Sequence, residues 1–267
     1  MPNNENNVCR LCEGILVKKF NKKILNKYNI DYFECKTCYS LMSEKPYWLK
    51  EAYDDKSTYF DTGVFYRNWE TFIVTFLVSK LFKFKNLIDY GGGTGLFTRI
   101  CRDYNLNCYS LDKFSQTIYA HGFTDPKFDQ LDLLTSFEVF EHFENPKDDL
   151  NFIFKKNPKA VLVTTVFYKN DGENWFYLEL ETGQHIFFYS KKAIQLIADK
   201  FNYDVYFFEC GFTFFLEKKI KMNKFYIFLL KKIIIRKKIL KFLKILTCFF
   251  SEKGYVTDYE FLKKKNY

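Results

Sequence analysis

The sequence predicts an α/β protein built on a doubly wound, mostly parallel sheet, and two patterns support this fold class. Short apolar segments that suit buried strands alternate with helical segments between residues 86 and 216, as in βαβ units. A glycine cluster, GGGTG at residues 91–95, directly follows one of these strand segments, although the whole chain has only eleven glycines. A glycine-rich turn after a strand is where open α/β sheets admit small ligands.

The alternation divides this region into strand segments joined by helices. The strand segments are 87–90, 106–111, 133–137, 160–166, 205–209 and 212–216. The helices fall near 95–104, 147–156 and 191–201, and Ser190 is expected to cap the last of them. The last two strands are close enough in sequence to form a hairpin at the edge of the sheet.

Composition divides the chain into four pieces, of which the ligand-binding domain at 86–216 is the third. Residues 1–40 form a small four-cysteine module, and residues 41–85 form a connector and an apolar helix that packs on the main sheet. Residues 217–267 form a basic extension in which apolar residues recur at helical spacing. These apolar positions are Ile235, Ile239, Phe242, Leu243, Leu246 and Phe249.

The net charge of +9 comes from the C-terminal end of the chain. Residues 216–267 hold 15 Lys and Arg against 4 Asp and Glu, whereas the rest of the chain holds 26 and 28. A basic groove across the main domain is therefore not expected, which argues against a nucleic-acid partner. An amphipathic basic helix can lie on an anionic membrane surface, so peripheral membrane contact is one hypothesis for the extension. Packing against the domain or a second subunit is the alternative.

The sequence shows neither a signal peptide nor a membrane span. The first residues, MPNNENNVCR, have no apolar core. The longest apolar run near the C-terminus, FYIFLL at 225–230, is far shorter than a bilayer requires. We therefore expect a cytoplasmic protein.

Four cysteines near the N-terminus have the spacing of a metal site. Cys9 and Cys12 form one Cys-x-x-Cys pair, and Cys35 and Cys38 form a second pair after 22 intervening residues. Each pair can place both sulfurs on one tight turn, and short strands between the pairs can bring the turns together. The spacing predicts a structural Zn²⁺ ion with four thiolate ligands. A redox dithiol and four unrelated thiols are the alternatives.

The glycine cluster fits S-adenosylmethionine better than a dinucleotide. The dinucleotide pattern Gly-x-Gly-x-x-Gly fails in every frame, because its third small residue is missing or its spacing is wrong. The pattern Asp-x-Gly-x-Gly-x-Gly fits Asp89, Gly91, Gly93 and Gly95 without a miss. Asp89, at the end of the first strand, can supply the negative charge that the ammonium group of the ligand needs.

The next strand supplies the acid that a ribose needs. Asp112 follows Asp89 by 23 residues, in YSLDKF, where such sheets place a carboxylate that binds ribose hydroxyls. Phe114 follows closely and can pack near an adenine face. A turn or cap role for Asp112 is the alternative. The sequence thus predicts S-adenosylmethionine as the cofactor, held by the glycine loop and two carboxylates.

Two of the three histidines are candidate bases for a hydroxyl or amine acceptor, because imidazole titrates near physiological pH. His142 follows Glu138 and Glu141, and Glu138 shares a helical face with His142. His185 lies in ETGQHIFFYS, while His121 lies in a turn and is discounted. Local hydrogen bonding is the alternative for both. Glu-x-x-Glu-His also suggests a metal site, but no matching ligand cluster in the sequence supports one.

The segments LIDYGGGTGLFTR, YSLDKF and LLTSFEVFEHFENP together resemble the class I S-adenosylmethionine-dependent methyltransferases. The later WFYLELETGQHIFFYSKKAIQLIA resembles a narrower branch in which an N-terminal, zinc-ribbon-like module with four cysteines also occurs. The resemblance implies a Rossmann-like methyltransferase fold whose seven-stranded sheet ends in an antiparallel strand. It also implies that the cofactor lies over strands one and four, with Phe137 and Glu138 among its contacts.

The resemblance implies an S-adenosylmethionine-dependent methyltransferase that acts by in-line methyl transfer, with His185 or His142 as a base. We expect a small-molecule acceptor, such as a sugar, a sugar nucleotide or a surface-glycan component. An RNA methyltransferase that uses the zinc module and the basic tail is an alternative, as is a non-catalytic binding protein. The carboxylate beside the adenine amine stays unassigned among Asp125, Asp129 and Asp132.

Overall fold

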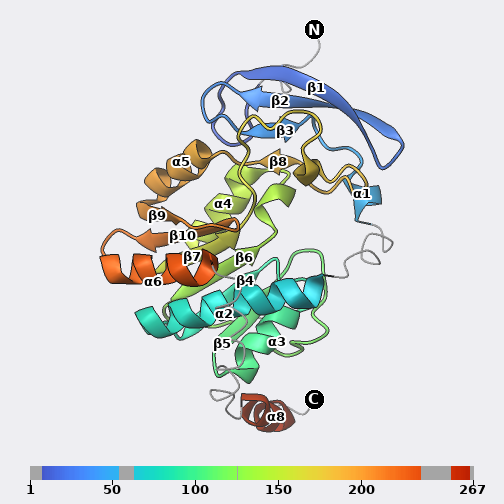
Figure 1. The fold of residues 1–267 in the computed structure, drawn as a ribbon. Helices are drawn as coiled ribbons and strands as arrows, with labels where there is room; N and C mark the ends of the chain where they lie inside the picture. Colours follow the sequence, from blue (N-terminus) through green and yellow to red (C-terminus); the bar gives the residue numbers. More distant parts are fainter. Residues whose placement is uncertain (1–7, 54–62, 125, 236–253, 265–267) are drawn as a thin grey trace. The chain divides into compact units, whose positions relative to one another are not determined.

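The computed structural model describes residues 8–53, 63–124, 126–235 and 254–264 (Figure 1). The chain separates into two compact units that are each assembled from several segments. The first unit comprises residues 1–62, 138–155 and 164–205, and the second comprises residues 63–137, 156–163 and 206–267. The two units alternate along the chain, unlike the four consecutive pieces expected from the sequence.

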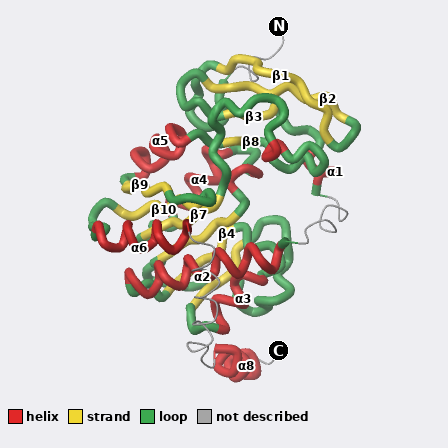
Figure 2. Tube along the Cα trace, in the orientation of Figure 1, coloured by secondary structure: helices red, strands yellow, loops and turns green. Residues whose placement is uncertain are grey.

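The predicted parallel sheet belongs mainly to the second unit. Its strands, which are yellow in Figure 2, follow the order β5-β4-β6-β7-β10-β9. β4 pairs in parallel with both β5 and β6. The strands are β4 (Asn86–Tyr90), β5 (Asn107–Leu111), β6 (Leu133–Phe137), β7 (Ala160–Thr164), β9 (Tyr203–Phe207) and β10 (Phe212–Glu217). Each of them overlaps a strand segment predicted from the sequence.

The edge of this sheet is the expected hairpin. β9 and β10 are hydrogen-bonded neighbours joined by residues 208–211 alone, and so short a connection requires antiparallel strands. The described residues between β5 and β6 form turns and irregular chain, so the sheet contains six strands in the described part of the chain. The resemblance implies seven. The Rossmann-like α/β class is confirmed with this difference.

Helices of the second unit include α2 (Val64–Phe82), α3 (Leu96–Asp103) and α6 (Lys224–Ile235), and α2 packs against both of the others. α2 buries one apolar stretch in the core of the sheet. The core side chains that are almost completely buried include Phe72, Leu87, Leu133, Leu162 and Phe214. This core fixes β4 and α3, between which the glycine cluster lies.

The basic extension is described in two parts, α6 and α8 (Gly254–Lys264). α8 packs on α3, where the buried carboxylate of Asp258 accepts hydrogen bonds from Arg99 and Arg102 at 2.7 to 2.8 Å. Most of the predicted amphipathic helix, residues 236–249, lies outside the described residues. None of the helices in the described part has the length and apolar character to cross a membrane.

The first unit contains a separate four-stranded sheet with the order β1-β2-β3-β8. β1 (Leu16–Ile24) and β2 (Tyr28–Cys35) form the antiparallel hairpin that the sequence predicts between the cysteine pairs. β3 (Leu41–Ser43) follows, and β8 (Phe187–Phe188) pairs antiparallel with it. A segment from far downstream therefore completes the N-terminal sheet, which the sequence did not predict.

The remaining helical elements of the first unit are short. They are α1 (Leu49–Ala52), α4 (Pro146–Lys155), α5 (Lys191–Phe201) and the 3₁₀ turns η3 (Phe140–His142) and η4 (Phe176–Leu178). Ser190 caps α5 as predicted, because its Oγ accepts a hydrogen bond from the Ala193 N–H at 3.0 Å. η3 begins shortly after β6 ends and carries one of the two candidate histidines.

Candidate functional site

The glycine cluster forms the loop between β4 and α3, and its glycines are needed for different reasons. Gly91, Gly93 and Gly95 have φ angles of +74°, +53° and +81°, in the left-handed region that other residues rarely adopt. Gly92 is needed for space, because a Cβ there would lie 2.4 Å from Oδ2 of Asp89. The loop therefore depends on glycine for both its conformation and its close packing.

Two of the left-handed glycines differ in what surrounds them. A Cβ at Gly95 would lie 2.8 Å from Cγ2 of Thr117 and 3.1 Å from the backbone nitrogen of Ala120. A Cβ at Gly93 would meet no described atom within 4 Å. Gly95 thus permits the loop to pack, whereas Gly93 borders open space in which a ligand can approach the backbone.

Asp89 lies buried beneath this loop. The hydroxyls of Thr98 and Thr135 donate hydrogen bonds to its two oxygens at 3.2 and 3.3 Å. Burial raises the pKa of Asp89 to about 7. Sequence reasoning missed both threonines, although a polar residue inside the apolar segment LLTSF is a usable signal for Thr135. Contact between Asp89 and a ligand ammonium group stays a prediction.

Asp112 holds the loop at the end of β5. Its Oδ2 accepts a hydrogen bond from the Gly93 N–H at 2.9 Å, and its Oδ1 accepts from the N–H groups of Phe114 and Ser115 at 2.8 and 2.7 Å. Carboxylate oxygens carry more lone pairs than these bonds use, so ribose hydroxyls can still bind. The structure thus brings Asp112 to the glycine loop, while its role in ligand binding stays a prediction.

The two aromatic residues assigned to the cofactor differ in their surroundings. The side chain of Phe114 is 89% exposed at the surface of the second unit. Phe137 is half-buried at the end of β6, with its ring centroid 5.1 Å from that of Phe97 and 6.3 Å from that of Phe212. These contacts make Phe137 part of the packed core at the carboxyl end of the sheet.

Glu138 directly follows β6 and has an unusual backbone conformation. Its φ angle is +54°, and its N–H donates a hydrogen bond to Oγ1 of Thr164 at 3.1 Å. Several other non-glycine residues, such as Glu13 and Tyr39, have the same conformation, so the φ angle alone does not mark a site. The side chain of Glu138 is exposed, and its contact with the cofactor stays a prediction.

Of the three aspartates that could bind the adenine amine, Asp132 already has hydrogen-bonding and ion-pair partners within the protein. Its carboxylate accepts hydrogen bonds from the N–H groups of Lys85 and Asn86 and forms an ion pair with Lys159 at 2.7 Å. Asp125 lies outside the described residues.

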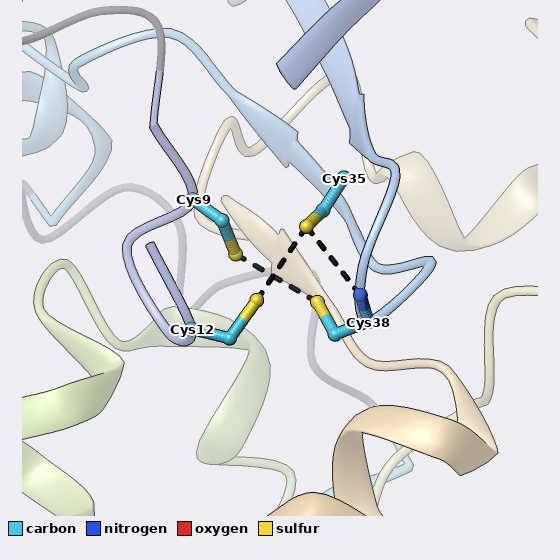
Figure 3. Close-up of side chains that lie close together, drawn as sticks. All are labelled: Cys9, Cys12, Cys35 and Cys38. Atoms are coloured by element: carbon cyan, nitrogen blue, oxygen red, sulfur yellow. Dashed lines mark hydrogen bonds between the residues drawn. The ribbon is translucent and has the colours of Figure 1, made fainter. Parts of the chain in front are cut away.

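The four predicted zinc ligands come together in the first unit, with their sulfurs facing one another (Figure 3). All four Sγ atoms lie within 4.8 Å of one another, with Cys9 and Cys38 at 3.7 Å and Cys12 and Cys35 at 3.5 Å. A tetrahedral Zn²⁺ with bonds of about 2.3 Å separates its sulfurs by about 3.8 Å, so the residues fit this ion. A hydrogen bond from Cys9 lowers the pKa of Cys38 to about 5, which favours a thiolate.

Both Cys-x-x-Cys turns have the same backbone geometry. In each turn the N–H of the first cysteine donates to the carbonyl five residues later. The pairs are Cys9 with Gly14 at 2.8 Å and Cys35 with Ser40 at 2.9 Å. The residue four positions on, Glu13 or Tyr39, has a φ angle near +60° and donates its N–H back to the cysteine carbonyl. Two equivalent turns therefore present the four sulfurs.

The first unit also brings His142 and His185 together. Their ring centroids lie 4.9 Å apart with nearly perpendicular planes. Nδ1 of His142 lies 3.1 Å from both the Gln184 carbonyl oxygen and the Tyr53 hydroxyl, and Nδ1 of His185 lies 2.8 Å from the Tyr177 carbonyl oxygen. Because a carbonyl only accepts hydrogen bonds, we assign the ring proton to Nδ1 in both histidines. Each Nε2 then keeps its lone pair.

Glu141 lies buried beside these histidines. Its Oε1 accepts a hydrogen bond from the Tyr177 hydroxyl at 2.5 Å, and its Oε2 has no partner in the described part of the chain. Burial raises the pKa of Glu141 to about 8, lowers that of His142 to about 3 and also lowers that of His185. Both imidazoles are therefore neutral at pH 7. Sequence reasoning did not foresee the burial of Glu141.

The comparison with protein families decides which family this is. A family model described as a methyltransferase domain matches residues 65–206, more than half of the chain. The chain belongs to this methyltransferase family. The match contains the glycine loop, Asp112, η3 and both candidate histidines. It confirms the class I methyltransferase predicted from the sequence.

The comparison with curated proteins finds no match to this methyltransferase. Among solved structures, it is similar to the methyltransferase domain of bacterial CtHen1, with 21% identity and a TM-score of 0.42, over 56% of this chain and 98% of that one. It is also similar to the magnesium protoporphyrin IX methyltransferase ChlM of Synechocystis PCC 6803, with 11% identity and a TM-score of 0.40, over 63% of this chain and 92% of that one. WbdD matches with 14% identity and a TM-score of 0.39, over 65% of this chain and 43% of that one.

Proposed function

We propose that this methyltransferase transfers the methyl group of S-adenosylmethionine to a small-molecule acceptor, such as a sugar, a sugar nucleotide or a surface-glycan component. The glycine loop is the observation that carries the proposal. Its Gly93 borders open space and donates its N–H to Asp112. This combination fits a ligand that needs close backbone approach next to a ribose.

The residues around the loop fit the cofactor. Asp112 would accept hydrogen bonds from the ribose hydroxyls, and Gly93 would leave room for the ligand beside the backbone. Asp89 lies under the same loop and would add negative charge when ionised. When bound, S-adenosylmethionine supplies a methyl group that is already activated by the sulfonium charge.

The acceptor needs a different set of groups, and the histidines of the first unit supply candidates. His142 and His185 are neutral at pH 7 because burial lowers both pKa values. Since Nδ1 donates to a backbone carbonyl in each ring, Nε2 is the atom that would accept a proton from an acceptor hydroxyl. The base role predicted from the sequence is part of this proposal.

Charge favours a small acceptor over a nucleic acid. Residues 1–215 hold slightly more acidic than basic side chains, and Glu138 and Glu141 lie close enough to interact electrostatically. A phosphodiester chain would meet repulsion from the exposed carboxylate of Glu138, whereas a small hydroxylated molecule would find hydrogen-bonding partners. A sugar-like acceptor fits this balance.

The cofactor part of the proposal is tested by titration calorimetry of S-adenosylmethionine into the full chain. Asp112→Ala should weaken binding about tenfold to a hundredfold, because hydrogen bonds to a charged group contribute about 1.5–3 kcal/mol. Asp148→Ala, which removes an exposed carboxylate of α4, is the matched control and should bind as the wild type does. Equal affinity in all three proteins would refute the assignment.

The acceptor part is tested with a labelled methyl group against sugar nucleotides, glycans and RNA. Transfer to a sugar or sugar nucleotide supports the proposal. Preferential transfer to RNA with strong salt dependence would overturn the acceptor class but keep the cofactor site. Tight cofactor binding without transfer to any acceptor would favour a non-catalytic binding protein instead.

A further inference from the structure

Three side chains with metal-binding atoms converge in the first unit, away from the four cysteines in sequence. The ligand atoms of Glu141, His142 and His185 all lie within 4.8 Å of one another. Glu141 and His142 come from η3, whereas His185 comes from the segment just before β8. The sequence pattern Glu-x-x-Glu-His lacked a matching ligand, and the fold supplies it from more than 40 residues downstream.

Both histidines are oriented as metal ligands usually are. In each ring Nδ1 contacts a backbone carbonyl, that of Gln184 for His142 and that of Tyr177 for His185, and the Tyr53 hydroxyl also contacts Nδ1 of His142. Such a contact fixes the ring and leaves the Nε2 lone pair for a cation, and it is the usual outer contact of a metal-bound imidazole. Tyr177 contributes twice, because its hydroxyl also holds Oε1 of Glu141.

The burial of Glu141 is an observation in favour of a metal site that is independent of the orientation of the histidines. Its side chain is fully buried, and Oε2 has no hydrogen-bond partner in the described part of the chain. An unpartnered oxygen of a buried carboxyl group is costly to keep. The converging atoms are one carboxylate oxygen of Glu141 and one ring nitrogen of each histidine, so a cation bound among them would give the buried carboxyl group a partner.

We propose that Glu141, His142 and His185 bind a divalent transition-metal ion at a site separate from the four-cysteine site. Two imidazole nitrogens and one carboxylate oxygen suit Zn²⁺, Fe²⁺ or Mn²⁺, whereas Mg²⁺ prefers oxygen ligands. Three protein ligands leave coordination positions open, which distinguishes this site from the closed structural site made by four thiolates. Glu138 adds negative charge that acts on both Glu141 and His185.

The open positions suggest what the ion would do, and this step rests on the proposed function. An oxygen of the acceptor could occupy them, so the ion would bind an acceptor that carries a hydroxyl or carboxylate group. With the ion bound, the imidazole lone pairs are used for coordination, so this inference replaces the histidine base of the proposed function with positioning of the acceptor through the ion. Metal binding itself requires neither cofactor nor acceptor.

The test is a metal count on the full chain. The protein is saturated with Zn²⁺, freed of excess ion by gel filtration and analysed by mass spectrometry for metal content. We expect two zinc ions per chain in the wild type and one in His185→Ala and His142→Ala. His121→Ala is the matched control, because this histidine belongs to the second unit, and it should retain two.

A second variant guards against misfolding. Glu141→Gln keeps the size of the side chain and removes its charge, so it should lose the second zinc ion while its circular dichroism spectrum stays unchanged. Co²⁺ separates the two sites further, because thiolate ligands give an intense charge-transfer band and imidazole and carboxylate ligands do not. The Co²⁺ ion that His185→Ala loses should therefore be the one without that band.

Two results would overturn the proposal: a wild type with a single zinc ion, bound by the cysteines, or variants of the three residues that retain both ions. Calorimetry with S-adenosylmethionine is independent of this count. Failure of the metal site would therefore leave the cofactor assignment intact, and failure of cofactor binding would leave the metal count intact.

Discussion

The glycine loop and the four-cysteine site are both built from tight turns with left-handed residues, but they use different residue types there. In the loop these residues are glycines, and at Gly95 a Cβ would collide with its surroundings. In the cysteine turns they are Glu13 and Tyr39, whose side chains are exposed. The comparison teaches that glycine is required where something must approach the backbone, whereas an ordinary residue suffices where only the turn is needed.

The two sites also neutralise their buried acidic groups differently. Asp89 accepts hydrogen bonds from two threonine hydroxyls, and burial holds its pKa near 7, so a proton satisfies it. The four thiols lie at distances that suit a metal ion. We therefore expect the loop to keep its shape without a ligand and the cysteine turns to depend on one.

The largest effect should come from removing two of the predicted zinc ligands. Cys35→Ser combined with Cys38→Ser should release the ion and unfold the sheet of the first unit, because a structural zinc site contributes on the order of 10 kcal/mol. Metal analysis and thermal unfolding followed by circular dichroism measure this. Cys210→Ser, which alters an exposed thiol outside the site, is the control and should change neither. A wild type that contains no zinc would break the comparison.

A smaller effect should follow from the charge state of Asp89. Its pKa is about 7 in the folded chain against 3.8 for an ordinary aspartate, so the folded state binds more protons between these values. The free energy of unfolding should therefore fall as the pH rises from about 4 to about 7, by no more than several kcal/mol. Urea unfolding across this range measures the slope.

Asp89→Asn should flatten this pH dependence, because an amide has no proton to lose. Glu141, whose pKa is raised to about 8, contributes a slope of the same sign that persists in this variant. If wild type and Asp89→Asn showed the same slope, Asp89 would be ionised in the folded chain and the contrast between the two sites would disappear.

The smallest change in stability is expected from two glycine substitutions, which together distinguish backbone strain from a clash with the ligand. Gly93→Ala and Gly172→Ala both place a Cβ at a positive φ with no described atom within 4 Å. Each should lose about 1–2 kcal/mol of stability. Only Gly93→Ala should also weaken S-adenosylmethionine binding, about tenfold or more, because its methyl group enters the open space by the loop. Calorimetry and urea unfolding of both variants test this, and unchanged affinity in Gly93→Ala would place the ligand elsewhere.

Local patterns made most of the large sheet predictable. The strands from β4 to β10 in that sheet are short apolar runs, and α3, α4 and α5 have the apolar spacing of helices, so each lay close to its predicted range. Asp89, the glycines and Asp112 fall within 24 residues of one another and act largely through the backbone. Such a site can be recognised from the sequence because glycines and residues at the ends of strands determine its geometry.

The other features depend on contacts between distant segments. β8 is only two residues long and has no periodicity, so nothing in its own sequence assigns it to the N-terminal sheet. The hydrogen bond between Tyr177 and Glu141 and the approach of His185 to His142 arise only once the chain has folded. The resemblance implied a seventh strand, but the described residues between β5 and β6 form none. This segment is rich in polar and turn-forming residues, which disfavour a strand.

The pairing of β3 with β8 has a consequence for how this architecture could arise. The four-cysteine module takes the last strand of its sheet, β8, from a segment far downstream. Removing the module alone would leave β3 with an unpaired edge and β8 without its partner strand, so the module is not a self-contained unit. A gene rearrangement that moved the module would have had to keep both β3 and β8. We therefore expect the four-cysteine module to be inherited together with the segment that contains β8.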